Sequence, residues 1–382
     1  MRILEVCPFS SGICGVWSRA SEEAKRLAEA GYEVRVFSSN KTKGAQTIAR
    51  ERENIGKVLI QRFKAIKLGG ESFTYFNYQK EALDYSPDII IVHNYRHLHT
   101  LVALNVARKL RKLGKRCKVV LVTHAPFVEG NITRRFFESW IVKLYDLTVG
   151  TLTLPLFDEI LPIARWEIPY LLRIGAKNSQ LKYIPNGIPE LFFSQKKSSE
   201  REHLLFLGRI SPKKKLDTLI KAIAIINQGK KEVFLHIVGP KEKDYYESLA
   251  KLTNSLNMNK YVKFMGPIQG LNEKIKVIDE AKAFVLPSRV EGMPQALIEA
   301  MAREKIVVAS NSQAIRDIIK DNHDGYLFEF DNPEDLARVI KKATSKFHQK
   351  IRFAARKKVE LFSWDRVIKS LEKVLNEAYS SK

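Results

Sequence analysis

Short apolar segments rich in β-branched residues alternate along the chain with longer segments in which apolar residues recur at helical spacing. The near-continuous apolar runs at 89–92 and 119–122 indicate strands buried on both faces, as in parallel sheets covered by helices. The pattern predicts strands at residues 2–6, 33–37, 88–92, 118–123, 203–208, 233–239 and 283–287. It predicts helices at residues 18–30, 100–113, 216–227 and 295–303.

The order strand, helix, strand is repeated twice over, which predicts the fold class α/β with two doubly wound domains. The polar segment 195–199 precedes a fresh strand, so we place the boundary there, with domains at 1–195 and 196–360. A last helical stretch occupies 361–382. Ligands of open parallel sheets bind beyond the carboxyl ends of the strands, so the loops that follow strands are where a site is expected.

The composition of the 382 residues is that of a folded protein. No apolar run reaches the ~20 residues of a membrane span. The N-terminal segment has the pattern of a buried strand rather than that of a signal peptide, so we expect a cytoplasmic protein. The three cysteines are odd in number and form no Cys-x-x-Cys pair, which argues against a disulfide framework or a zinc site.

The net charge of +23 requires an explanation. Both parts of the chain are basic, with +11 for residues 1–190 and +12 for the remainder, and residues 89–128 contain no acid. Such an excess suits nucleic acid, anionic lipid headgroups or phosphorylated substrates. The plainer interpretation is a solvated helix face.

A nine-residue segment, from Glu291 through Gly292 to Glu299, follows the strand at 283–287. Pro294 suits the first turn of a helix, and the free amides there form an anion site together with the helix dipole. These amides belong to Met293, Gln295 and Ala296. Glu291 is placed to reach the hydroxyls of a sugar and Glu299 a ribose diol. Alternatively, Glu299 lies on the solvated face of an amphipathic helix.

Two cations, Arg209 and Lys214, flank the short loop after the strand at 203–208. Arginine offers a planar fork and lysine a point charge, and together they suit a diphosphate. Such cations would stabilise the charge that develops on a diphosphate leaving group. The alternative is a solvated loop, because residues 213–215 form a run of lysines.

Two histidines, His93 and His124, follow buried strands of the first half and are expected at the mouth of its sheet. Metal binding by His93 with its neighbours is the less favoured interpretation, because no carboxylate or cysteine accompanies them. The sequence also contains no Asp-x-Asp, the usual carboxylate pair for a divalent cation on a diphosphate. We therefore expect no metal and no other cofactor. Gly12 and Gly15 in the first strand-to-helix turn are weak evidence for a ligand nearby.

Taken together, these motifs resemble the retaining glycosyltransferases of family 4, which have the two-domain GT-B fold. The resemblance covers nearly the whole chain and is strongest from about Tyr183 to Asp335. Its most specific part is Leu286-Pro-Ser-x2-Glu291-Gly-x6-Glu299, supported by Ile184-Pro-Asn-Gly187, Gly208-Arg209-x4-Lys214 and Val262-x-Phe-x-Gly266. It implies two Rossmann-like domains facing each other across a cleft, with the C-terminal helix crossing back to the N-terminal domain.

The resemblance also assigns roles. Arg209 and Lys214 would hold the donor diphosphate, Glu299 the ribose, and Glu291 the transferred sugar with the loop from Gly292 to Ala296. His124 and Glu291 would act on that sugar as catalytic residues, with His93 on the acceptor side. Gly15 would lie beside the phosphate or the acceptor, and the backbone at Gly266 and Ile268 beside the base. The sequence departs from the family at Cys14, at Lys215 and at 313–317, where glycine or a Gly-Gly-x-Pro-Glu stretch is usual.

We therefore predict an enzyme that moves a hexose from a nucleotide-sugar donor to a hydroxyl of a glycan or a lipid-linked acceptor. The basic segment between Arg108 and Lys118 is expected to dock on an anionic membrane surface. Two alternatives stay open at this point. One is a sugar-nucleotide epimerase or hydrolase of the same fold, and the other a basic nucleic-acid-binding protein, although the chain shows no recognised nucleic-acid-binding module.

Overall fold

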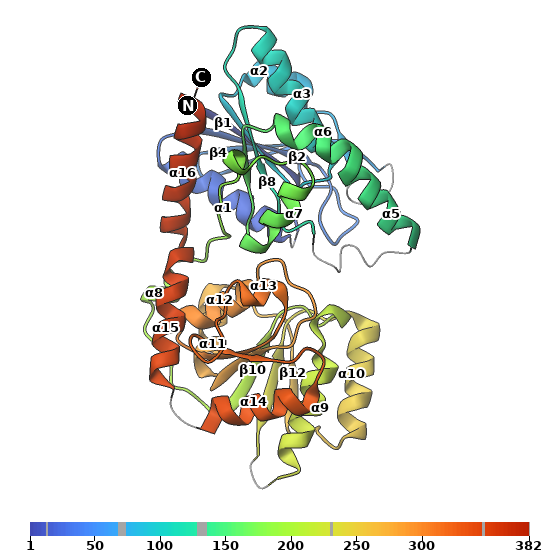
Figure 1. Cartoon of the computed structure of the whole chain (residues 1–382), viewed down its shortest axis with the longest axis vertical. Coiled ribbons are helices and arrows are strands. Elements are labelled where there is room, and N and C mark those ends of the chain that lie inside the picture. The colour runs from blue at the N-terminus through green and yellow to red at the C-terminus, as the bar shows by residue number, and fades with distance from the viewer. Residues whose placement is uncertain (13, 68–73, 128–135, 230–231, 346–347, 382) are drawn as a thin grey trace. The chain divides into compact units, whose positions relative to one another are not determined.

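The computed structural model describes residues 1–12, 14–67, 74–127, 136–229, 232–345 and 348–381. Its backbone contacts divide the chain into two compact units, Met1–Gly187 with Asp365–Lys382, and Ile188–Trp364. Each unit contains its own parallel sheet with helices packed around it, as Figure 1 shows. Each sheet is a doubly wound α/β sheet, which confirms the predicted fold class.

The first unit is built on a seven-stranded sheet with the order β3-β4-β2-β1-β7-β8-β9. All neighbours are parallel except the edge pair β3 and β4. The chain starts in the middle of the sheet with β1, places β2, β3 and β4 on one side of it and then β7 on the other, so β1 and β7 flank a switch point. The strands are β1 (Arg2–Phe9), β2 (Glu33–Ser39), β3 (Arg52–Ile55), β4 (Val58–Phe63), β7 (Ile89–His93), β8 (Lys118–Val122) and β9 (Glu159–Leu161). A separate antiparallel pair joins β5 (Ala65–Lys67) and β6 (Thr74–Phe76).

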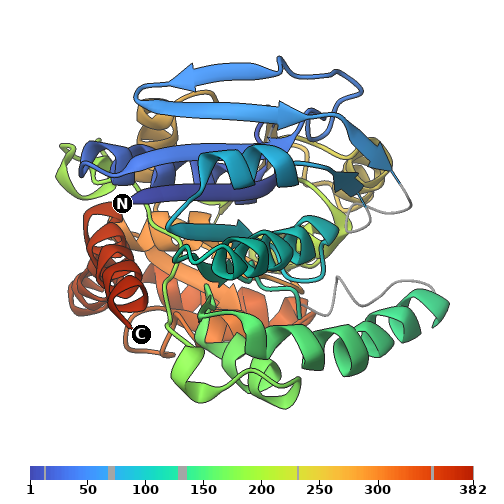
Figure 2. The ribbon, with the colours of Figure 1, turned by 90° about the horizontal axis from the view of Figure 1, so that it is seen from above.

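Helices connect these strands because parallel neighbours require a crossover rather than a tight turn. The main ones are α1 (Gly15–Glu29), α2 (Gln79–Tyr85), α3 (Leu98–Lys112), α5 (Phe136–Tyr145) and α7 (Ile168–Arg173). After α5 the chain continues through a π-helical turn η2 (Asp146–Gly150), α6 (Thr151–Thr153) and a 3-10 turn η3 (Leu154–Leu156). Figures 1 and 2 both show α5 extending away from the sheet of its unit.

The second unit is built on a six-stranded, all-parallel sheet with the order β12-β11-β10-β13-β14-β15. It too starts in the middle, and the switch point lies between β10 and β13. The strands are β10 (His203–Leu207), β11 (Phe234–Val238), β12 (Val262–Met265), β13 (Ala283–Leu286), β14 (Ile306–Ser310) and β15 (Tyr326–Phe328). The helices include α8 (Leu191–Ser194), α9 (Leu216–Asn227), α10 (Lys243–Ser255), α11 (Leu271–Glu280), α12 (Gln295–Ala302), α13 (Gln313–Arg316), α14 (Pro333–Ser345) and α15 (Gln349–Val359).

The unit boundary lies eight residues before the predicted one, at Gly187 rather than at residue 195. The reason is that α8 belongs to the second unit. Arg303 donates hydrogen bonds to the carbonyl oxygens of Phe192 and Gln195, and Arg356 donates to that of Phe193. These contacts hold α8 against the second unit although its sequence looks like the end of the first.

The last helix, α16 (Trp364–Ser380), belongs mainly to the first unit. It lies against α1, where Arg26 contacts Asp365 at 2.8 Å, and Asn376 bonds the Tyr32 hydroxyl. Its buried face includes Leu371 and Leu375. The chain therefore leaves the first unit at Gly187 and returns to it at Asp365, four residues after the predicted boundary at 361. Within the described residues no helix is both long and apolar enough to cross a membrane.

Candidate functional site

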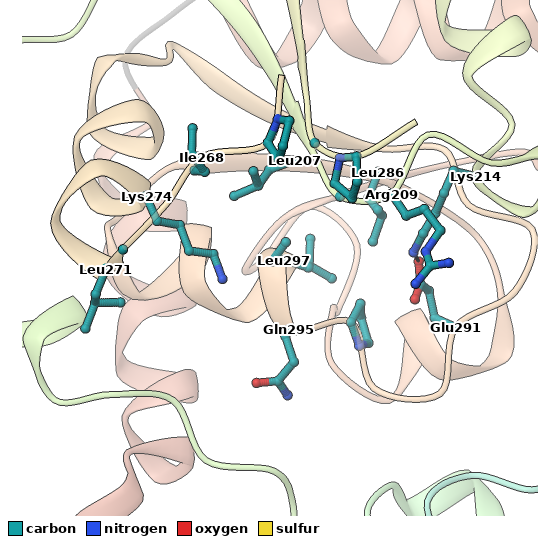
Figure 3. Close-up of a pocket in the computed structure, with 17 residues that line it drawn as sticks. Leu207, Arg209, Lys214, Ile268, Leu271, Lys274, Leu286, Glu291, Gln295 and Leu297 are labelled. Carbon is teal, nitrogen blue, oxygen red and sulfur yellow. Dashed lines mark hydrogen bonds and ion pairs between the residues drawn. The ribbon is translucent and has the colours of Figure 1, made fainter. Parts of the chain in front are cut away.

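A cavity of about 550 Å³ lies at the carboxyl ends of β10 and β13, beside the switch point of the second sheet. Its walls come from the loops after β10, β11, β12 and β13 and from the starts of α11 and α12. Figure 3 shows Arg209, Lys214 and Glu291 on one side of this pocket and Ile268, Leu271 and Lys274 on the other. It thus sits where ligands of doubly wound sheets bind.

The first side of the pocket is charged. Lys214 Nζ lies 2.5 Å from Glu291 Oε1, and both side chains are largely shielded from solvent. Arg209 is exposed, and its guanidinium makes no ion pair with the described residues. The pair fixes the lysine in the pocket, while the arginine keeps its full hydrogen-bonding capacity for an incoming anion.

The backbone at the end of β10 lets this loop come close to the end of β11. Gly239 has φ +142°, and a Cβ built on it would lie 2.1 Å from the carbonyl oxygen of Gly208. Both residues line the pocket. A side chain at Gly239 would therefore displace the loop that carries Arg209.

The opposite side of the pocket contains a second ion pair, between Lys274 Nζ and Glu299 Oε1 at 2.5 Å. Lys274 lines the cavity, and Glu299, with 5% of its surface exposed, stands behind it on α12. Gln295 Nε2 at this wall and Glu299 Oε2 behind it are buried polar atoms that have no hydrogen-bond partner among the described residues. Unsatisfied buried groups are costly, so they are suited to be satisfied by a ligand.

Helix α12 begins at Gln295 with its N-terminus at the pocket. Pro294 is the N-cap residue, one position earlier than predicted, and no side chain caps the helix. Its first amides and the positive end of its dipole are therefore open to a ligand, as an anion site requires.

The pocket brings together most of the residues predicted for the second half. Those that line it are Arg209, Lys214, Ile268, Glu291, Pro294, Gln295 and Ala296. Gly266, Gly292, Met293 and Glu299 are next to lining residues but do not line the cavity themselves. Lys274 was not predicted, because a lysine in the helix-period segment 271–280 looks like a solvated side chain until the fold is known.

In the first unit, the two predicted histidines contact each other at the carboxyl ends of β7 and β8. His93 Nδ1 lies 2.9 Å from His124 Nε2, and His93 Nε2 lies 3.0 Å from Glu5 Oε2. Burial lowers the pKa of both histidines well below the usual value, so both rings are neutral at neutral pH. Burial and the nearby Glu23 charge raise the pKa of Glu5.

The expectation that His93 presents its side chain at the mouth of the sheet is wrong. His93 is completely buried, because both of its ring nitrogens are engaged within the unit, whereas His124 is partly exposed. Two carboxyl groups do lie beside His93, contrary to the sequence argument that no carboxylate accompanies it. The atoms of Glu5, Glu23 and His93 that could ligate a metal ion lie within 4.8 Å of one another. The Arg19 guanidinium, 2.8 Å from Glu23, places a positive charge beside this cluster.

Gly15 is the first residue of α1, three residues ahead of the predicted start of that helix. A Cβ on Gly15 would meet nothing within 4 Å. Gly12 is the residue of this turn that must be glycine, since its φ is +83° and a Cβ would lie 2.2 Å from the carbonyl oxygen of Lys43. The absence of a side chain at Gly12 thus leaves room for the protein's own backbone at Lys43.

The basic segment from Arg108 to Lys118 covers the end of α3 and the start of β8. Arg111 and Lys118 contact Asp158, at 2.6 and 3.4 Å, and Arg116 donates to the carbonyl oxygen of Ser381. The exposed cations Arg108, Lys109, Lys112 and Lys115 form no ion pair with the described residues. Part of the predicted basic surface is therefore used inside the protein, and part stays exposed.

Comparison with known families gives two matches that follow the two units. The family model described as "Glycosyltransferase Family 4" matches residues 13–190, and the one described as "Glycosyl transferases group 1" matches residues 187–358. Each covers slightly less than half of the chain, and together they extend from residue 13 to residue 358.

Among relatives in sequence, an uncharacterized glycosyltransferase of Methanocaldococcus jannaschii is 25% identical over 385 residues, which cover 95% of this chain and 94% of the relative. An N-acetylgalactosaminyltransferase of Campylobacter jejuni, which by its name acts on a PP-undecaprenol-linked glycan, is 32% identical over 37% of this chain and 39% of its own length.

Among solved structures, sucrose-phosphate synthase of Thermosynechococcus elongatus superposes with a TM-score of 0.78 over the full length of both chains at 18% identity. HepE of Anabaena gives 0.73 over 99% of this chain and all of its own, at 16% identity. These similarities establish the fold.

Proposed function

Because the chain belongs to the glycosyltransferases of family 4, we propose that it transfers a hexose from a nucleoside diphosphate sugar to a hydroxyl group, with retention of anomeric configuration and without a metal. The observation that carries this proposal is the pocket at the switch point of the second sheet. Its charged side, its uncapped helix N-terminus and its unsatisfied polar atoms suit the parts of such a donor.

Arg209 and Lys214 would hold the diphosphate, where they stabilise the charge that develops as the sugar leaves. The α12 N-terminus adds a positive dipole end to the same pocket. These groups replace the metal that an Asp-x-Asp pair would hold in other sugar transferases. The rate then comes from positioning and electrostatics.

At the other side of the pocket, Glu299 Oε2 would accept from the ribose diol, with the backbone at Ile268 beside the base. Glu291, held by Lys214, would orient the hydroxyls of the transferred sugar. His124 stays a prediction as the catalytic contact from the first unit, with Gly15 beside the phosphate or the acceptor.

Names of similar proteins support parts of this assignment. HepE was solved with UDP and with UDP-glucose, and TarM of Staphylococcus aureus with UDP. The acceptor named for the Campylobacter jejuni relative is lipid-linked. We therefore propose a glycan or a lipid-linked glycan as the acceptor of this chain.

The epimerase or hydrolase alternative uses the same donor but needs no acceptor, so it would consume the nucleotide sugar alone. The relatives found in sequence are named as transferases, which favours transfer. Nucleic-acid binding has no comparable support, since both halves of the chain match sugar transferase families.

The proposal predicts that Lys214→Ala lowers the turnover number for sugar transfer by more than about tenfold, because the developing diphosphate charge loses a partner. The matched control is Lys213→Ala, which removes the adjacent cation outside the pocket lining. Initial rates are measured by release of nucleoside diphosphate. An unchanged turnover in Lys214→Ala, or an equal loss in both variants, would exclude the diphosphate role.

We further propose that the first unit docks on an anionic bilayer. Exposed cations on α3 suit lipid headgroups. On the stretch from α5 to η3, six large apolar side chains are exposed, namely Trp140, Ile141, Leu144, Leu147, Leu152 and Leu156. Threonine hydroxyls among them donate to backbone carbonyls of the preceding turn, as Thr148 does to Leu144, which leaves this stretch still less polar.

A further inference from the structure

A row of hydrogen bonds runs from the middle of β1 to the partly exposed ring of His124. Glu5 contacts His93 at 3.0 Å, and His93 contacts His124 at 2.9 Å. Glu5 and His93 have no exposed surface. The three residues come from β1, from β7 and from the loop after β8, which are neighbouring elements of one sheet.

Glu5 is an unusual residue for its place. It lies within the apolar part of the parallel strand β1, flanked by Leu4 and Val6, and its Oε1 has no hydrogen-bond partner among the described residues. Burying a carboxyl group costs free energy unless it is fully bonded. An apolar residue at this position would stabilise the sheet more, so packing alone does not explain the carboxyl group.

The position of His124 is fixed from a second direction. Its φ is +57° and that of Ala125 is +52°, a left-handed conformation that is strained for such residues. The buried carboxyl of Glu167 holds this backbone, because it accepts from the Thr123 hydroxyl at 2.6 Å and from the Ala125 amide at 3.0 Å. The ring is therefore aimed by both its backbone and its partner His93.

The charges around the row decide which atoms carry hydrogen. Arg19 pairs with Glu23, so these two balance each other, and an ionised Glu5 would leave one uncompensated charge in the core. Burial and the Glu23 charge raise the pKa of Glu5, and burial lowers those of His93 and His124. The other titratable groups facing the row are Cys7 on β1 and His97 and His99 at α3.

When Glu5 is the neutral acid, the position of every hydrogen atom in this row of hydrogen bonds is determined. The Glu5 O–H donates to His93 Nε2, the His93 Nδ1–H donates to His124 Nε2, and the one ring hydrogen of His124 then lies on Nδ1. An ionised Glu5 reverses every donor, so that His124 Nδ1 becomes an acceptor. The state of one core carboxyl thus sets the hydrogen-bonding character of a partly exposed ring nitrogen.

We propose that Glu5 and His93 are positioning residues that hold His124 as the neutral tautomer with hydrogen on Nδ1, so that its free nitrogen is a donor. Within the described residues this nitrogen has no other partner. The inference rests on the proposed function only where it names the group that accepts the hydrogen bond from His124 Nδ1, namely an oxygen of the sugar or of the acceptor substrate. The tautomer itself is a property of the ligand-free protein.

The test is the tautomer of His124, observed by long-range 1H–15N correlation on the 15N-labelled full chain after dialysis against EDTA, so that no bound metal fixes the ring. The His124→Gln variant identifies the resonances. The expected result is a protonated Nδ1 and an unprotonated Nε2. A protonated Nε2, or a ring protonated at both nitrogens, would overturn the proposal.

Two substitutions of Glu5 separate positioning from packing. The Glu5→Gln amide can still donate to His93, so the His124 tautomer and kcat/KM for transfer are expected to stay within about twofold of wild type. Glu5→Leu keeps an apolar core but has no donor, and is expected to mix the tautomers and lower kcat/KM by more than about tenfold. An unchanged tautomer in a folded Glu5→Leu would contradict the inference.

Nucleotide binding and the His124 tautomer are measured separately, so an error in this inference can be told apart from an error in the proposed function. Nucleotide binding to the second unit is expected to be the same in wild type, Glu5→Gln and Glu5→Leu, because no residue of the row lines that pocket. If the tautomer is as expected but no sugar is transferred, the row stands and the receiver of its hydrogen is wrong. If Glu5→Leu is unfolded, the wild-type spectrum alone decides.

Discussion

Lys214 and Glu291 are 77 residues apart in the sequence, and their charged atoms lie 2.5 Å apart in the pocket. Their proximity could be predicted, because each follows a buried strand and the carboxyl ends of neighbouring strands meet at one edge of a sheet. The backbone conformation of Lys215 explains why the family usually has glycine at this position. Its φ is +50°, in the left-handed region where glycine is the least strained residue, and here its ammonium is held by Asp331 at 2.9 Å.

Glu5 allows a prediction on the pH dependence of stability. Its pKa is raised by burial and by Glu23 above 4.5, so the folded protein keeps a proton that the unfolded chain releases. The stabilisation is complete below pH 4.5 and is lost as the pH rises through the native pKa. We therefore expect the free energy of unfolding of wild type, relative to Glu5→Gln, to fall from pH 4.5 upward.

Urea unfolding of both proteins over this range, followed by circular dichroism, measures that difference. The subtraction removes the contributions of all other groups that titrate alike in the two proteins. A difference that is constant or rises with pH would show that Glu5 is ionised in the folded protein. Sequence reasoning did not find this residue, and its one signal was an acid at the centre of an apolar strand.

At the scale of elements, the seven predicted strands are present with ends that differ by up to three residues, β1 for example ending at Phe9 rather than at residue 6. Central strands are recognisable because both faces are apolar. The edge strand β3 has the sequence Arg-Glu-Asn-Ile and is mostly exposed, so no hydrophobic pattern marks it. The exposed apolar stretch from α5 to η3 was likewise not singled out, since apolar helical residues are normally buried.

The surface of the first unit allows a test of membrane docking. We expect wild type to float with vesicles containing anionic lipid, and Arg108→Glu/Lys112→Glu to lose most of this binding at low salt, since each basic residue contributes roughly 1 kcal/mol. Leu144→Ser/Leu147→Ser is expected to lose the part of the binding that persists at high salt.

The matched control is Lys350→Glu/Lys357→Glu on α15 of the second unit, which changes the net charge by the same amount and is expected to bind like wild type. Equal binding of wild type to neutral and anionic vesicles would rule out the electrostatic part of the proposal. Equal losses in the two charge-reversal variants would show that net charge, rather than this surface, is responsible.

At the scale of the whole molecule, the chain order differs from the spatial order, because α16 completes the first unit after the second has been built. Leu371→Ala removes a completely buried side chain of α16 and is expected to destabilise the first unit by about 2–5 kcal/mol. Leu336→Ala, equally buried on α14, is the matched change in the second unit.

Amide hydrogen exchange followed by mass spectrometry locates the two effects. Leu371→Ala is expected to speed exchange in β1, β2 and α1, and Leu336→Ala in the second sheet. Faster exchange of the second sheet in Leu371→Ala would contradict the division into these units. The sequence predicted the number of units and the last helix, but the boundary depended on the contacts of α8, which no local pattern shows.

Calorimetric titration with UDP, GDP and ADP, in the absence of added metal, measures whether the pocket of the second unit binds the diphosphate of a nucleotide sugar. We expect one of the three to bind wild type and Lys213→Ala equally well. The Arg209→Ala/Lys214→Ala variant is expected to lose that binding by more than about tenfold. Binding that survives the double substitution, or no binding of any of the three to wild type, would contradict this role of the pocket.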